Sequence, residues 1–142
     1  MTLYLDSSAL AKLYVQEHGT EAVQAAIEKH QGAVAVSTLT LPEVTHAVTR
    51  NARALGASDA TERELHKHIL EDWESLERIP VMDFIAKEAA MLARSKGLRG
   101  ADAVQLATCA LLSRERRGVN FLGFDDALND AAQTVVKLWE AT

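Results

Sequence analysis

Acidic residues follow two of the apolar runs in this sequence. Asp6 comes directly after "TLYL" at residues 2–5, and Asp125 and Asp126 come directly after "VNFLGF" at residues 119–124. In open parallel sheets, ligands bind beyond the carboxyl ends of the strands. If both runs are strands of such a sheet, Asp6 and Asp125 lie at the same edge, with Asp126 one step further along the chain. An aspartate in this setting can also simply start the next helix.

Two further acids fall where helices are predicted to begin. "TLPE" at residues 40–43 has the spacing of a capping box, with Thr40 as N-cap and Glu43 reaching back. Local sequence therefore favours a capping role for Glu43, although a helix that follows a strand starts at the ligand-binding edge as well. Asp102 gains from the helix dipole, but Gln105 and Cys109 extend a polar stripe from it along an apolar helix. Burying that stripe is costly unless it faces a polar cleft, so a site and a cap both remain open for Asp102.

Four carboxylates in these positions can converge on a patch about 10 Å across, because neighbouring strands lie about 4.8 Å apart. Carboxylates that close repel one another unless a cation joins them. A set of oxygen ligands without His or Cys suits Mg²⁺ or Mn²⁺ rather than zinc. Such ions activate water and stabilise the charge on a phosphoryl group. The pattern thus predicts metal-assisted phosphoryl chemistry.

The elements that would position these acids alternate along the chain. Such alternation predicts an α/β fold with three layers (α/β/α), in which helices cover both faces of a mostly parallel sheet of four to five strands. At 142 residues, the chain has the length of one domain, spanning residues 1–142. The predicted strands are 2–5, 33–37, 79–82, 119–124 and a weaker one at 135–138, and the predicted helices are 7–15, 21–29, 41–55, 59–76, 84–96, 101–112 and 126–132.

The pair of helices between the second and third strands is the one irregularity in this order. Leu65, Ile69, Trp73 and Leu76 form an apolar stripe at helical spacing in the second helix of the pair. The stripe either packs onto the first helix or leaves a groove for the apolar helix of a partner.

Bulk composition narrows the class of protein. No apolar run approaches the roughly 20 residues that span a bilayer, and the N-terminus lacks the pattern of a signal peptide. The single cysteine, Cys109, fits a reducing cytoplasm. The net charge of −5 argues mildly against nucleic-acid binding through a bulk positive field, but neutralising four acids with metal leaves −1.

Four short motifs in order resemble those of PIN-domain ribonucleases, and specifically the toxin subunits of VapBC-type toxin–antitoxin pairs. The similarity runs essentially end to end. The motifs are "LYLDSSALAKLYVQEHGTEAV", "VSTLTLPEV", "RGADAVQLATCALL" and "FLGFDDALNDAA". The resemblance implies a PIN-like fold whose acidic set is Asp6, Glu43, Asp102 and Asp125, whereas Asp126 falls at a variable position. The family usually has Ser or Thr two residues before the fourth acid, where this chain has Gly123, so a supporting hydroxyl is missing and the orientation of Asp125 is less secure.

The resemblance also implies an activity and partners. Family members are Mg²⁺- or Mn²⁺-dependent endoribonucleases, commonly homodimeric, and are neutralised by a cognate antitoxin bound across the cleft. For this chain, Asp6, Asp102 and Asp125 would hold metal, and Glu43 would hold metal or orient the attacking water. Ser7 would hold a carboxylate or phosphate oxygen, and Arg99 is a weaker candidate for a contact with the RNA backbone.

Two alternatives stay open. Asp6 after the first strand also suits the nucleophile of a phosphoaspartyl phosphatase, but those enzymes have a second Asp two residues on, where this chain has Ser8. A catalytically silent domain kept for protein binding is the other alternative, and the missing hydroxyl at Gly123 leaves room for it.

Overall fold

A single five-stranded sheet organises the protein in the computed structural model, which describes residues 1–141. The strand order is β3-β2-β1-β4-β5, and every neighbouring pair is parallel. The strands are β1 (Thr2–Leu5), β2 (Ala33–Ser37), β3 (Glu77–Ile79), β4 (Val119–Leu122) and β5 (Lys137–Leu138). The helices are α1 (Ser7–Ala11), α2 (Thr20–Lys29), α3 (Thr40–Ala54), α4 (Asp59–Trp73), α5 (Asp83–Lys96), α6 (Gly100–Glu115) and α7 (Asp126–Ala132).

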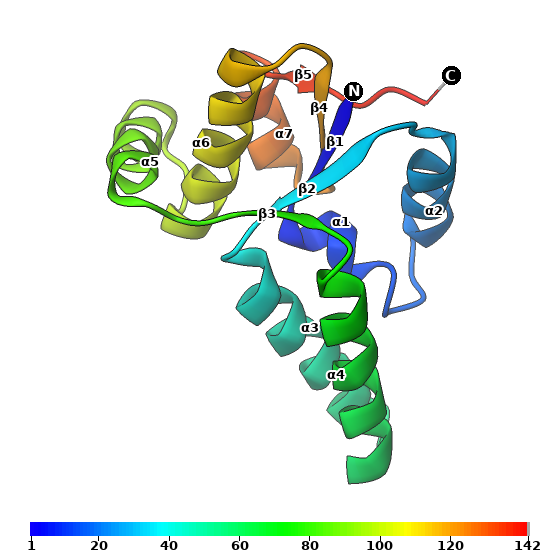
Figure 1. Cartoon of the computed structure of the whole chain (residues 1–142). Coiled ribbons are helices and arrows are strands. Elements are labelled where there is room, and N and C mark those ends of the chain that lie inside the picture. Colours follow the sequence, from blue (N-terminus) through cyan, green and yellow to red (C-terminus); the bar gives the residue numbers. More distant parts are fainter. Residues whose placement is uncertain (142) are drawn as a thin grey trace.

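Helices cover both faces of the sheet, which confirms the predicted three layers (Figure 1). The alternation of β1 shows why: Leu3 and Leu5 pack into one core with α1, α2, α3 and α4, whereas Tyr4 packs into the other with α6 and α7. All three side chains are fully buried, as expected for the central strand of a parallel sheet. Because β1 and β4 are adjacent at the centre, their carboxyl ends meet at one edge.

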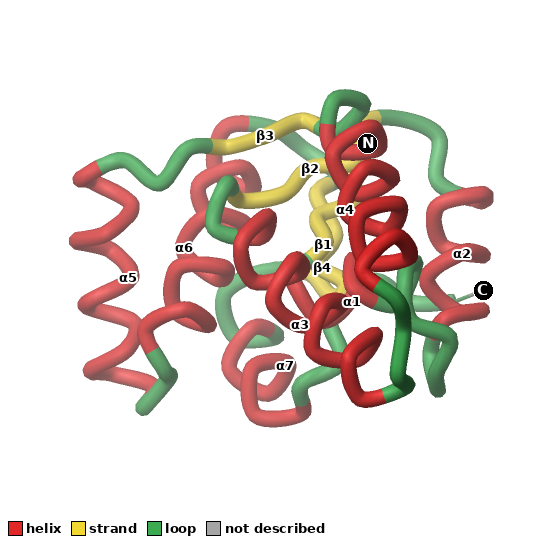
Figure 2. Tube along the Cα trace, turned by 90° about the horizontal axis from the view of Figure 1, so that it is seen from below, coloured by secondary structure: helices red, strands yellow, loops and turns green. Residues whose placement is uncertain are grey.

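Helices α3 and α4 run side by side and extend away from the sheet (Figures 1 and 2). Ile69 is 2% exposed and Trp73 is 8% exposed, in one core cluster with Val44 and Val48 of α3. The centre of the apolar stripe of α4, Ile69 and Trp73, is therefore buried in the same cluster as α3. The first alternative, packing onto α3, thus holds for Ile69 and Trp73, whereas Leu65 and Leu76 stay partly exposed.

Several predicted boundaries are also wrong. The third strand was expected at 79–82 but occupies Glu77–Ile79, because Pro80 has no N–H for the ladder. The first helix ends at Ala11 instead of residue 15, since the chain tightens into turns in which the Lys12 N–H bonds the Ala9 carbonyl at 3.2 Å. In addition, α4 ends at Trp73 rather than at residue 76, β4 ends at Leu122 rather than at residue 124, and β5 is confined to two residues.

Within residues 1–141, none of the helices combines the length and the apolar character that crossing a membrane would require.

Candidate acidic active site

Asp6 lies at the carboxyl end of β1 and is 3% exposed. It is the N-cap of α1: its Oδ1 accepts hydrogen bonds from the Ala9 N–H at 2.9 Å and from the Ser8 hydroxyl at 2.7 Å. Its own N–H donates to the Leu122 carbonyl at 3.2 Å, which ties it to the end of β4. The side chain thus caps a helix and is also fixed at the edge where the two central strands end.

Asp125 follows β4 and is the N-cap of α7, where its Oδ1 accepts from the Leu128 N–H at 2.8 Å. Its neighbour Asp126 is the first residue of α7, and both aspartates are exposed. Asp126 lines a pocket beside Lys12 and His18. Capping and site membership are compatible for Asp125, because a carboxylate has a second oxygen for another partner.

Glu43 does not close the capping box that its spacing suggests. Helix α3 begins at Thr40 after Leu39 as N-cap, without a side-chain capping bond. Instead, Glu43 Oε1 accepts from the Ser7 hydroxyl at 2.6 Å and from Gln105 Nε2 at 3.2 Å. The local capping interpretation is wrong, because partners 36 and 62 residues away hold this carboxylate. Ser7 holds a carboxylate oxygen, one of the two roles considered for it.

Asp102 lies in the first turn of α6 and is partly exposed, with Arg99 as the N-cap residue of the same helix. The polar stripe that starts at Asp102 continues only to Gln105, which is buried among polar partners from other elements. Cys109 packs in the apolar core between the sheet and α6, and burial raises the pKa of its thiol to about 12. The thiol is therefore an inert core group and not part of the polar stripe.

The four acids act on one another electrostatically. Burial is the largest cause that raises the pKa of Asp6 to about 6, and the charges of Asp102 and Glu43 add to it, against the hydrogen bonds from Ser8 and Ala9. The pKa of Asp102 is raised by burial first, then by the charges of Asp125 and Glu43, whereas Arg99 lowers it. The four carboxylates therefore lie close enough to influence one another's pKa, and Arg99 lies near Asp102.

The carboxylate oxygens of the four acids are suitable ligands for a hard divalent cation, but their side chains are not arranged around a common point. Across the described residues, no three His, Cys, Asp or Glu side chains form a group that could hold a metal ion as they stand. Carboxylates that sense one another's charge repel each other unless a cation joins them. All-oxygen ligands favour Mg²⁺ or Mn²⁺ over zinc. Side chains would have to move inward to bind the metal.

Gly123 approaches Asp6 too closely for any side chain in this arrangement. A Cβ atom at position 123 would lie 2.6 Å from Asp6 Oδ2 and 2.9 Å from Asp6 Cγ. The hydroxyl that lies near this position comes from Ser8, which donates to Asp6 Oδ1 and accepts from the Phe124 N–H at 3.0 Å, so it supports the first acid rather than Asp125. Sequence reasoning missed Ser8. Its position two residues after Asp6, in the first turn of a helix, was the available signal.

The sequence pattern of the PIN domain matches residues 3–133. The chain belongs to the PIN domain family. Ribonuclease VapC45 of Mycobacterium tuberculosis is 30% identical over 106 residues, which cover 75% of this chain and 73% of that protein. Among solved structures of this fold, the Mycobacterium tuberculosis toxin VapC20, which cleaves the sarcin-ricin loop, has a TM-score of 0.71 at 15% identity and covers 91% of this chain and 94% of its own. A toxin–antitoxin complex from Klebsiella pneumoniae has a TM-score of 0.61 at 20% identity over 84% of this chain and 82% of that one.

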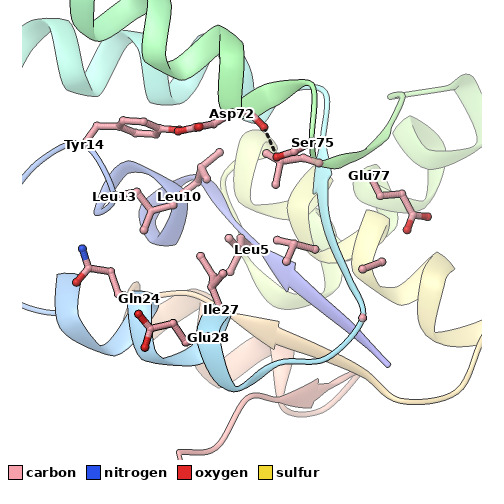
Figure 3. A pocket seen from close by; sticks show the side chains of 14 residues that line it. Leu5, Leu10, Leu13, Tyr14, Gln24, Ile27, Glu28, Asp72, Ser75 and Glu77 are labelled. Atoms are coloured by element: carbon pink, nitrogen blue, oxygen red, sulfur yellow. Dashed lines mark hydrogen bonds between the residues drawn. The ribbon is translucent and has the colours of Figure 1, made fainter.

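The PIN domain also carries an apolar cavity of about 520 Å³ that none of the four acids lines (Figure 3). Leu10 and Leu13 come from the region of α1, and Ile27 comes from α2. At the rim, the Tyr14 hydroxyl donates to Asp72 Oδ2 at 2.7 Å. The cavity is thus an apolar floor with carboxylates at its edge, separate from the acidic site.

Proposed function

We propose that this chain is a metal-dependent endoribonuclease toxin that a cognate antitoxin neutralises. The observation that carries the proposal is geometric: Asp6 and Asp125 follow the adjacent central strands β1 and β4, and the hydroxyl of Ser7, the residue after Asp6, holds the Glu43 carboxylate. A PIN domain with a ribonuclease relative at 30% identity supports nuclease activity, and PIN-domain nucleases generally depend on divalent metals. RNA as the substrate, and Mg²⁺ or Mn²⁺ as the ion, are our finer assignments.

The residues would divide the work according to their surroundings. Asp6, Asp102 and Asp125 would hold the metal, and Glu43 would hold metal or orient the attacking water. A divalent cation bound there activates water and stabilises the charge that develops on the phosphodiester. Ser7 fixes the Glu43 carboxylate through the 2.6 Å bond. We assign Arg99 to the RNA backbone, because its exposed guanidinium lies beside the acids and phosphates attract Arg.

The alternatives are less well supported. A phosphoaspartyl nucleophile must reach its substrate, yet Asp6 is 3% exposed with Oδ1 engaged by two donors. A silent binding domain would not need four mutually repelling carboxylates, which cost stability. Homodimer formation, a cytoplasmic location and the assignment of residues 1–142 to one domain stay predictions.

Cleavage of RNA by the purified protein, with Mn²⁺ or Mg²⁺ and with a chelator in its place, tests the proposal. Asp125 and Asp126 supply a matched pair of variants at adjacent exposed positions. Asp125→Asn keeps a good N-cap and is expected to lower cleavage steeply without a change in melting temperature, whereas Asp126→Asn is expected to leave cleavage little changed. The reverse ranking would move the fourth acid to Asp126, and metal-independent cleavage would exclude the mechanism.

We place the antitoxin at the apolar cavity rather than along the buried stripe of α4. An apolar segment with a basic side chain complements the cavity floor and the Glu28 and Asp72 carboxylates at its rim. Ile27→Glu puts a charge on this partly exposed floor and is expected to weaken binding of the cognate antitoxin by about 2 kcal/mol or more, as losses at buried interface anchors do. Calorimetry measures the affinity, with Met91→Glu on the exposed face of α5 as control. Equal affinities for the two folded variants would remove this cavity from the interface.

A further inference from the structure

A polar network around the buried Gln105 connects the acidic site to the core. Gln105 lies one turn after Asp102 on α6 and is 2% exposed. Its Oε1 accepts from the Tyr4 hydroxyl at 2.6 Å. Its Nε2 lies 2.9 Å from Thr40 Oγ1, 3.0 Å from Ser7 Oγ and 3.2 Å from Glu43 Oε1. One amide of α6 therefore bonds to residues of three other elements: β1, α1 and α3.

The direction of each hydrogen bond follows from its partners. Burial keeps the pKa of Tyr4 well above its usual value, so the Tyr4 hydroxyl stays protonated and donates to Oε1. This fixes the orientation of the amide and turns both Nε2 hydrogens away from Tyr4. One hydrogen serves Thr40, and the other is shared between Ser7 and Glu43. The Ser7 hydroxyl gives its only hydrogen to Glu43, so it must accept from Gln105.

We infer that Gln105 is the positioning residue of Glu43, holding its carboxylate toward the other acids through a direct bond and through Ser7. This inference rests on the proposed function. Without these bonds, the partly buried side chain of Glu43 could adopt several rotamers. Two donors on the same Oε1 fix one rotamer and leave the second oxygen for the metal or the water. Groups of this kind orient metal ligands and typically change metal affinity or activity by about 10- to 100-fold when removed.

The test removes the Gln105 amide and measures whether the resulting loss of activity and of Mn²⁺ affinity depends on Glu43. Gln105→Met keeps the length of the side chain and is expected to lower kcat for RNA cleavage and the affinity for Mn²⁺, each by about 10- to 100-fold, with KM for RNA unchanged. In the Glu43→Gln background, the same substitution is expected to have little further effect on either quantity. Losses that multiply in the double variant would overturn the inference.

A stability control separates positioning from packing. Gln105→Met strands the buried Tyr4 hydroxyl and lowers the melting temperature, and the further change Tyr4→Phe is expected to restore much of that loss, because removing both partners is close to neutral. Activity and Mn²⁺ affinity should stay low in that double variant. Recovery of both along with stability would show a merely structural role. Ile85→Ala, in the separate core cluster between α5 and α6, lowers stability away from the network and should leave Mn²⁺ affinity unchanged.

The two proposals fail in different ways. If the wild-type protein does not cleave RNA but binds Mn²⁺ more tightly than Gln105→Met, the proposed function fails and the role of Gln105 stands. If the wild-type protein cleaves RNA and Gln105→Met matches it in kcat and in Mn²⁺ affinity, only the inference about Gln105 fails.

Discussion

Asp6→Asn is expected to reduce RNA cleavage by more than about 100-fold, since loss of a supporting group alone costs up to about that much and loss of a ligand should exceed it. Asparagine matches aspartate in shape and is an equally good N-cap. The bonds from Ser8 and from the Ala9 N–H can therefore survive while the charge is lost. Initial rates on a single RNA with saturating Mn²⁺ measure the effect.

Two comparisons make this result specific. Combining Asp6→Asn with Asp102→Asn should cost far less than the product of the two single losses, because residues that act as one unit are not additive. Asp59→Asn, an exposed acid at the far end of α4, should cleave at the wild-type rate. Wild-type cleavage by the Asp6→Asn protein would refute the assignment of the acidic set.

The metal-free protein is expected to lose stability as pH rises from about 4 to above 6, by up to about 3 kcal/mol from Asp6 alone, at 1.36 kcal/mol per pKa unit. Burial raises the pKa of Asp6 from 3.8 to about 6 in the folded protein. Because this folded-state pKa lies above the unfolded value, the contribution is complete below the unfolded pKa and is lost as pH rises through about 6. Above that pH, folding must bury an ionised carboxylate.

The wild-type protein alone does not isolate this contribution, since other groups titrate as well. Arg116, for example, lowers the pKa of Glu77, which works in the opposite direction. The measured quantity is the difference in unfolding free energy between Asp6→Asn and wild type, in urea and with chelator, at pH 4 and at pH 7.5. The variant should gain on the wild type as pH rises, and millimolar Mn²⁺ should recover the wild-type loss at pH 7.5. A difference that is the same at both pH values would contradict the burial of an ionisable Asp6.

The two strand-end acids could be predicted because their positions follow from topology. Once "TLYL" and "VNFL" are parallel strands, Asp6 and Asp125 must lie at one edge, whatever the rest of the chain does. Glu43 could not be predicted in the same way. Its capping-box spacing is a local signal, whereas the donors that hold it come from α1 and α6 through contacts that only the folded chain makes. Glu43 entered the acidic set only through the resemblance to PIN-domain ribonucleases, because its local sequence indicated a helix cap.

The wrong boundaries share a cause of the same kind. β3 starts at Glu77, which pairs with Ala35 of β2, whereas hydrophobicity alone pointed to residues 79–82. The sequence correctly predicted an apolar stripe on α4, but it does not show how much of that stripe α3 covers in the folded protein. Trp73, the last residue of α4, is buried in one cluster with residues of α1 and α3, which are contacts that only the folded chain makes.

The close approach of Gly123 to Asp6 restricts which residues position 123 can accept in this chain. The hydroxyl beside the first acid is supplied from Ser8, across the edge from β4, and the space that a residue at 123 would need is filled by the Asp6 carboxylate. A serine introduced at 123 alone would add a second hydroxyl where there is no room, and a loss of Ser8 alone would leave none. Any residue larger than glycine at position 123 is therefore expected to displace the Asp6 carboxylate from the bonds that hold it, whichever residue stands at position 8.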